Sequence, residues 1–90
     1  MLYMVIERYK NRDAEAVYSR FREKGRMLPE GLEYVGSWVE PNFDRCFQLM
    51  ECDNPALFDQ WTVHWQDLVE FEIIEVLSSA DAAAAATSTS

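Results

Sequence analysis

The chain has 90 residues, which suffice for one domain and leave no room for a second. Sixteen acidic residues against eight basic ones give a net charge of −8, which disfavours nucleic acids and anionic membrane surfaces as partners. No apolar run approaches the roughly 20 residues of a membrane span. We also expect no secretory signal, because the first apolar run is short and charges follow it, so the expected location is cytoplasmic.

The first elements are a strand and a helix. Residues Leu2–Tyr9 are β-branched and aromatic without Gly or Pro, which predicts a strand. Asp13 is a good N-cap for a helix that Gly25 ends. Apolar residues recur within this helix at helical spacing: Ala14, Val17, Tyr18 and Phe21.

A hairpin follows. Residues 32–40 and 43–52 alternate in polarity, and Pro41-Asn42 suits a tight turn between them. A two-residue loop would place Trp38 opposite Arg45. Ser37 and Gln48 would then lie on the other face, where they could donate hydrogen bonds within a pocket.

The last elements are a second helix and a fourth strand. Asn54 and Pro55 predict the helix start, and an apolar stripe from Leu57 to Leu68 predicts its length. Residues 69–77 read as the closing strand. Residues 1–78 therefore form the domain, and the Ala, Ser and Thr residues of 79–90 form a low-complexity tail, expected to be disordered or a fraying helix.

The order of elements predicts an α+β, ferredoxin-like βαββαβ fold with a four-stranded antiparallel sheet and two helices on one of its faces. Right-handed crossovers place the third strand between the first two and the fourth strand outside the first. Seven of the eight basic residues fall in the first 26 positions, so we expect them to pair with the acidic second half.

The first strand is apolar on both faces, with Leu2, Met4 and Ile6 on one of them. Because two helices cover only one face of such a sheet, the other needs a cover of its own. We expect that cover to be a second copy of the chain, which makes a homodimer through the sheet face.

Several segments support this expectation by resemblance: the opening Met1-Leu2-Tyr3-Met4-Val5-Ile6-Glu7-Arg8-Tyr9-Lys10, Gly25-Arg26-Met27, Pro29-Glu30-Gly31-Leu32, Ser37-Trp38-Val39 and Cys46-Phe47-Gln48-Leu49-Met50-Glu51. Over roughly residues 1–78 they resemble a family of short bacterial proteins of unknown function. That family in turn resembles the dimeric α/β-barrel superfamily, which implies two ferredoxin-like sheets packed face to face. The resemblance carries no catalytic motif, so no functional residue is transferred.

Three residues are candidates for catalysis. Glu7 and Tyr9 share one face of the first strand, where an isolated carboxyl could act as an acid or base, or could form an ion pair. His64 is the only histidine and could act as a general base, although its place between two tryptophans also suits a packing role.

Trp38 and Arg45 are candidates for ligand binding. Arg45 could hold a substrate carboxylate, or it could form a cation–π pair with Trp38. Cys46 and Cys52 lie six residues apart in one strand, too far for a disulfide. The sequence contains no phosphate loop, dinucleotide fingerprint or metal-ligand spacing, so we expect no cofactor and no metal.

Two functions follow. The first is a small-molecule-binding or cofactor-free enzymatic domain with an apolar, aromatic pocket for a small apolar or aromatic ligand. The resemblance adds that superfamily members include cofactor-free monooxygenases and isomerases. The alternative is a non-catalytic homodimeric interaction or stress-type module without an active site. Whether the chain is an enzyme stays open at this point.

Overall fold

The computed structural model describes residues 1–87. Its elements follow the predicted order: β1 (Leu2–Tyr9), a short 3-10 turn (Lys10–Arg12), α1 (Ala14–Lys24), β2 (Glu33–Val39), β3 (Arg45–Glu51), α2 (Leu57–Thr62), β4 (Val69–Val76) and α3 (Ser79–Thr87). The α+β class and the βαββαβ order are confirmed.

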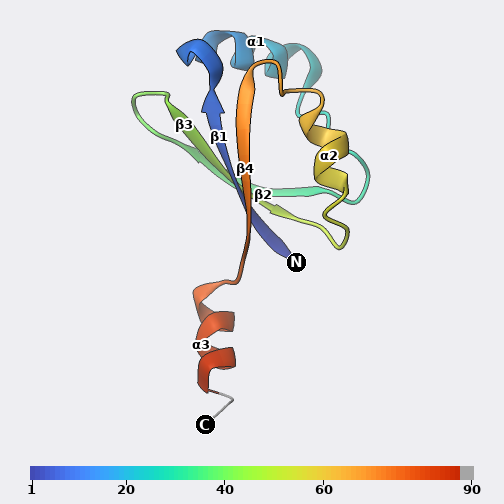
Figure 1. The fold of residues 1–90 in the computed structure, drawn as a ribbon, viewed down its shortest axis with the longest axis vertical. Helices are drawn as coiled ribbons and strands as arrows, with labels where there is room; N and C mark the ends of the chain where they lie inside the picture. The colour runs from blue at the N-terminus through green and yellow to red at the C-terminus, as the bar shows by residue number, and fades with distance from the viewer. Residues whose placement is uncertain (88–90) are drawn as a thin grey trace.

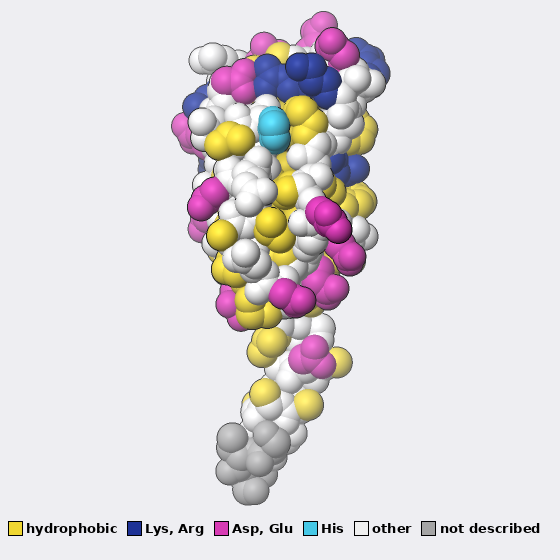
Figure 2. Space-filling view, turned by 90° about the vertical axis from the view of Figure 1, so that its right-hand side faces the viewer, with side chains coloured by type: hydrophobic (Ala, Val, Ile, Leu, Met, Phe, Trp, Pro, Cys, Tyr) yellow, Lys and Arg dark blue, Asp and Glu magenta, His cyan; other side chains and the backbone are white. Residues whose placement is uncertain are grey.

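The four strands form one antiparallel sheet in the order β2-β3-β1-β4, with α1 and α2 on one face (Figure 1). This is the predicted topology. The register places Arg8 at the end of β1 beside Glu70 at the start of β4. Lys and Arg gather toward one end of the side seen in Figure 2, whereas acidic side chains lie both at that end and over the rest of this side.

Helix α1 begins and ends where its capping residues predict. The Asp13 side chain accepts a hydrogen bond from the Ala16 amide at 3.1 Å, and Gly25 adopts a φ of 68° while its amide donates to the Phe21 carbonyl. Arg20 donates two hydrogen bonds to Asp67, at 2.7 and 2.8 Å. This pair joins α1 to the segment that follows α2.

Helix α2 is shorter than the apolar stripe predicts. It ends at Thr62, and a series of tight turns continues to Leu68, including a bond from the Trp65 amide to the Thr62 carbonyl. Trp61 in α2 and Trp65 in these turns still face the same way, because both indole groups donate to one backbone carbonyl, that of Arg26. These hydrogen bonds to a distant segment hold the chain after Thr62 in turns, where the apolar stripe alone would predict further helix.

The predicted hairpin register is wrong by two residues. Trp38 pairs with Phe47, not with Arg45, because the connection is longer than two residues. The Asn42 side chain accepts a bond from the Asp44 amide, which builds a local turn, and Phe43 takes a φ of 60°. The shift is an even number, so the assignment of β3 residues to the two faces is unchanged.

Burial divides the sheet into two faces, which we call inner and outer. The inner face packs against the helices and holds the core around Val5, Met50 and Trp61. On the outer face, Met4, Ile6 and Leu49 are half-buried and Trp38 is 60 % exposed. No described element covers this face within residues 1–87 (Figure 1).

Residues 79–87 of the tail form α3, which projects away from the sheet beyond the end of β4 (Figure 1). The remaining part of the predicted disordered tail, residues 88–90, lies outside the described residues. No helix within residues 1–87 is both long and apolar enough to cross a membrane.

Candidate functional site

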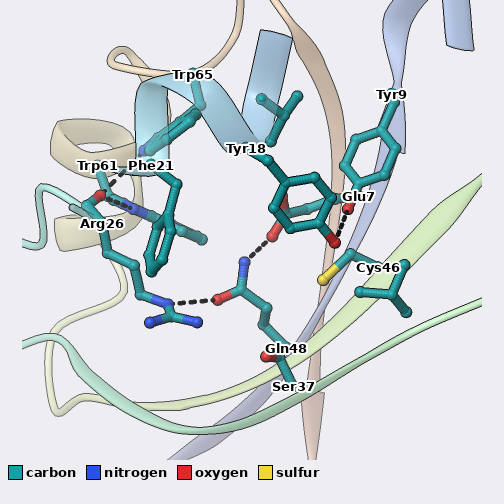
Figure 3. Close-up of a pocket in the computed structure, with 12 residues that line it drawn as sticks. Glu7, Tyr9, Tyr18, Phe21, Arg26, Ser37, Cys46, Gln48, Trp61 and Trp65 are labelled. Atoms are coloured by element: carbon teal, nitrogen blue, oxygen red, sulfur yellow. Dashed lines mark hydrogen bonds between the residues drawn. The ribbon is translucent and has the colours of Figure 1, made fainter. Parts of the chain in front are cut away.

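A cavity of about 100 Å³ lies between the inner face of the sheet and the two helices (Figure 3). Its floor comes from alternate residues of β1 and β3, among them Glu7, Cys46 and Gln48. Its walls are aromatic: Tyr9, Tyr18, Phe21, Trp61 and Trp65. The cavity is therefore an aromatic pocket with a polar floor.

Glu7 is the acidic group of this pocket. The residue is only 6 % exposed, and burial raises the pKa of its carboxyl to about 7, although the nearby Arg26 charge opposes the rise. The Gln48 side-chain amide donates a hydrogen bond to the carboxyl. Within residues 1–87 no cation lies in ion-pair contact with Glu7, so its proton is exchangeable near neutral pH.

Gln48 connects Glu7 to Arg26. The Arg26 Nε donates to Gln48 Oε1 at 3.4 Å, while Gln48 Nε2 faces Glu7 (Figure 3). This orientation of the amide is the one that satisfies both neighbours. A cation and a carboxyl therefore lie in one pocket with a neutral amide between them.

The backbone of Arg26 is held in place by the two tryptophans. Its carbonyl accepts from Trp61 Nε1 and from Trp65 Nε1, each at 3.0 Å. The guanidinium lies over the ring of Tyr34, 3.6 Å from its centroid, and 4.9 Å from that of Phe21. A bulge at residue 35 turns Tyr34 toward this side of the sheet, where it would otherwise lie on the outer face.

The remaining polar groups of the pocket stay neutral. The Tyr9 hydroxyl lies 3.5 Å from that of Tyr18, and burial raises the Tyr9 pKa well above its usual value. Burial, with the Glu7 charge, raises the pKa of the Cys46 thiol to about 12. A thiol that does not ionise is a poor nucleophile, so Glu7 is the acid–base candidate here.

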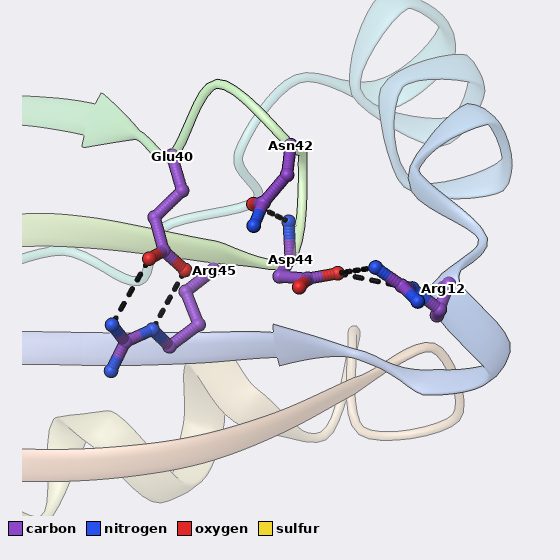
Figure 4. Close-up of polar contacts among 5 residues, drawn as sticks. All are labelled: Arg12, Glu40, Asn42, Asp44 and Arg45. Atoms are coloured by element: carbon purple, nitrogen blue, oxygen red, sulfur yellow. Dashed lines mark hydrogen bonds and ion pairs between the residues drawn. The ribbon is translucent and has the colours of Figure 1, made fainter.

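Of the five residues that the sequence suggests, the pocket contains Glu7 and Tyr9. Trp38 and Arg45 lie on the outer face instead, because side chains alternate along a strand and Cys46 already points inward. Arg45 donates two hydrogen bonds to Glu40, at 2.7 and 3.0 Å (Figure 4), and stacks over Phe47 rather than Trp38. It is thus not placed to hold a ligand in this pocket.

His64 lies outside the pocket as well. It is exposed at the surface (Figure 2), since it directly precedes Trp65 and points away from the side on which Trp61 and Trp65 pack. Its backbone carbonyl accepts a hydrogen bond from Arg20. No described contact gives it a role in proton transfer at the pocket.

The sequence reasoning placed Ser37 and Gln48 on the pocket side, and both line the cavity. It missed Arg26, which follows α1 in an irregular segment where no periodicity assigns a direction to a side chain. Within residues 1–87 no three His, Cys, Asp or Glu side chains gather closely enough to hold a metal ion.

The family model described as a domain of unknown function (DUF3303) matches residues 1–90. No curated protein and no solved structure matches the chain.

Proposed function

We propose that this chain, which belongs to the DUF3303 family, is a small-molecule-binding domain whose pocket takes a small aromatic ligand and holds it beside the buried carboxyl of Glu7. One observation carries the proposal: a carboxyl group lies buried in a cavity and has no ion-pair partner among residues 1–87. Such a group destabilises the fold when it ionises. Ionisable groups with a strongly shifted pKa are common at catalytic and ligand-binding sites.

The walls support an aromatic ligand. Aromatic rings pack well against flat apolar groups. A small number of well-placed polar groups then fixes the orientation of the ligand. Here the polar groups include the carboxyl of Glu7, the amide of Gln48, the guanidinium of Arg26 and the hydroxyls of Tyr9, Tyr18 and Ser37. An engineered cavity of about 150 Å³ binds benzene, so a cavity of about 100 Å³ holds most of one ring.

Tryptophan fluorescence tests this proposal, because Trp61 and Trp65 line the pocket whereas Trp38 does not. In a Trp38→Phe background we expect benzyl alcohol to change the fluorescence saturably. Ser37→Phe should abolish the change by filling the pocket. Val35→Phe, at an exposed position two residues away, should preserve it.

Native mass spectrometry of protein purified without added ligand is the second readout, since a retained small molecule would appear as added mass. A fluorescence response that does not saturate, or that is the same in Ser37→Phe and Val35→Phe, contradicts the pocket proposal.

The outer face favours a second, compatible function, that of a homodimeric module. The register aligns Trp38, Phe47 and Ile6 in one row across three strands, and Leu49 and Met4 in the next. We propose that a second copy of the chain covers these rows, because a contiguous apolar surface of this kind is uncommon on a monomer.

Sedimentation and native mass spectrometry test the dimer. Phe47→Glu, at the centre of the row, should give a folded monomer, because dimerisation would bury its carboxylate. The control is Val63→Glu, which changes an exposed apolar residue after α2 and should leave the mass unchanged. A monomeric unmodified chain, or equal masses for the two variants, excludes the sheet-face dimer.

A further inference from the structure

Arg26 is a cation that forms no direct ion pair with any residue of the described part of the chain. Among residues 1–87 the ion pairs within 4 Å join Arg12 to Asp44, Arg20 to Asp67 and Arg45 to Glu40, and Arg26 takes part in none of them. Four other basic residues in this part of the chain lack an ion pair as well, but each of them is exposed, whereas Arg26 is half-buried. The Arg26 guanidinium instead rests on aromatic rings and on the amide of Gln48.

The charge of the pocket depends on two residues. Around Glu7 the ionisable side chains are Tyr9 of β1, Tyr18 of α1, Cys46 of β3 and Arg26. Neither the tyrosine Tyr9 nor the thiol Cys46 ionises near neutral pH, because burial raises the pKa of each.

The other packed elements add no ionisable group to this lining. Helix α2 contributes Trp61 and Trp65, strand β2 contributes Ser37 and Val39, and β4 places Phe71 beside Glu7. The pocket therefore carries one positive charge when Glu7 is protonated and none when Glu7 is ionised.

We propose that the ligand of this pocket is a small aromatic carboxylate, whose charge pairs with Arg26 and whose oxygen accepts the proton of neutral Glu7 in a hydrogen bond. This proposal rests on the proposed function and names its ligand class. Guanidinium groups match carboxylates in geometry and bind them through two parallel hydrogen bonds. The protonated acid offers the donor that a second carboxylate needs, whereas two ionised carboxylates repel each other.

The affinity of the pocket for a carboxylate should depend on pH. The pKa of Glu7 is about 7 in the free protein, and a bound anion raises it further. Above that pH the protein must take up one proton from solvent when the carboxylate binds. Affinity then falls about tenfold for each unit of pH above the pKa of the free carboxyl.

Benzoate and benzamide test this directly, because they share a shape and differ in charge. Titrations in the Trp38→Phe background at about pH 6 and about pH 8 should show benzoate binding roughly tenfold more weakly at the higher pH, with benzamide unchanged. Calorimetry in buffers of different ionisation enthalpy should show proton uptake with benzoate at the higher pH. Glu7→Gln should remove both the uptake and the pH dependence.

Substitution of Arg26 tests the partner charge. Arg26→Gln should weaken benzoate at least tenfold more than it weakens benzamide, while Arg26→Lys should restore part of the benzoate affinity by restoring the charge. Circular dichroism checks that each variant is folded. If Arg26→Gln is unfolded, the comparison of Arg26→Lys with the unsubstituted arginine decides, since lysine lacks the bidentate geometry and should bind benzoate more weakly.

The outcomes separate the two proposals. Benzamide binding as tightly as benzoate, or benzoate affinity that does not change with pH, overturns the carboxylate inference and leaves the pocket proposal intact. If none of benzoate, benzamide and benzyl alcohol gives a saturable fluorescence change at millimolar concentration, both proposals are overturned.

Discussion

The two faces of the sheet are built from the same strands but differ in whether their charged side chains form ion pairs. On the outer face, Arg45 meets Glu40 in a two-fold hydrogen-bonded pair that is partly exposed. On the inner face, Glu7 and Arg26 share a pocket and are separated by Gln48. On the outer face the two charged groups form an ion pair where water already screens them. On the inner face, where burial strengthens electrostatic interactions, the two ionisable groups have no direct contact.

This difference indicates different roles. An exposed ion pair contributes little to stability or to binding, so the outer face retains its apolar rows as its distinguishing feature. The inner pocket holds a buried carboxyl and a guanidinium that forms no ion pair within residues 1–87, and the proposed ligand would be selected by this charge. The predictions below test this division, from the largest expected effect to the smallest.

The largest effect should come from exchanging one tryptophan on each face for alanine. Trp61 is 2 % exposed, packs beside Phe71 and bonds to the Arg26 carbonyl, so Trp61→Ala should lower the free energy of unfolding by about 3–5 kcal/mol. Trp38→Ala should change the unfolding free energy of the monomer by less than about 1 kcal/mol. Urea denaturation followed by circular dichroism measures both.

The Phe47→Glu background separates the roles of the two tryptophans, because it removes any contribution of dimerisation. Equal losses of stability for Trp61→Ala and Trp38→Ala in that background would mean that the outer face is as well packed within one chain as the inner.

The next effect is the pH dependence that Glu7 gives to stability. Its pKa is raised from 4.5 to about 7, so the folded state binds the proton more tightly than the unfolded state. Stability from this group is complete below the unfolded pKa and is lost as the pH rises to the folded pKa. The difference amounts to about 3 kcal/mol.

Glu7→Gln isolates this term, because the repulsion among the other acidic groups is common to both proteins. The unfolding free energy of Glu7→Gln relative to the parent should rise by about 3 kcal/mol between about pH 4 and about pH 8. Urea midpoints across this range measure it. A constant difference would show that Glu7 titrates normally and that the pocket does not hold its proton.

The smallest effect on stability should come from breaking the ion pair between Arg45 and Glu40 on the outer face. Arg45→Gln should leave the urea midpoint nearly unchanged, because water and ions screen a partly exposed pair. It should also leave the pH dependence of benzoate binding unchanged. A loss comparable to that of Arg26→Gln in benzoate affinity would place the carboxylate site on the outer face and reverse the comparison.

Local signals explain which parts of the fold the sequence predicts correctly. The bounds of β1 and α1 follow from an uninterrupted apolar run, the Asp13 cap and Gly25. Period-two alternation also assigns Gln48 to the pocket side, and an even register error does not change that assignment. In contrast, the end of α2 depends on indole bonds to a carbonyl 35 and 39 residues away, which no local pattern reports.

The sequence by itself therefore determined the order of the elements, the sheet topology and the two faces, because alternation, capping and crossover handedness act over short stretches of chain or as general rules. Only the tertiary structure decided which polar groups meet. The segment after α1 brings Arg26 to Gln48 because Trp61 and Trp65 hold its backbone. Such contacts depend on the path of an irregular segment and on burial, and both exist only once the helices have packed on the sheet.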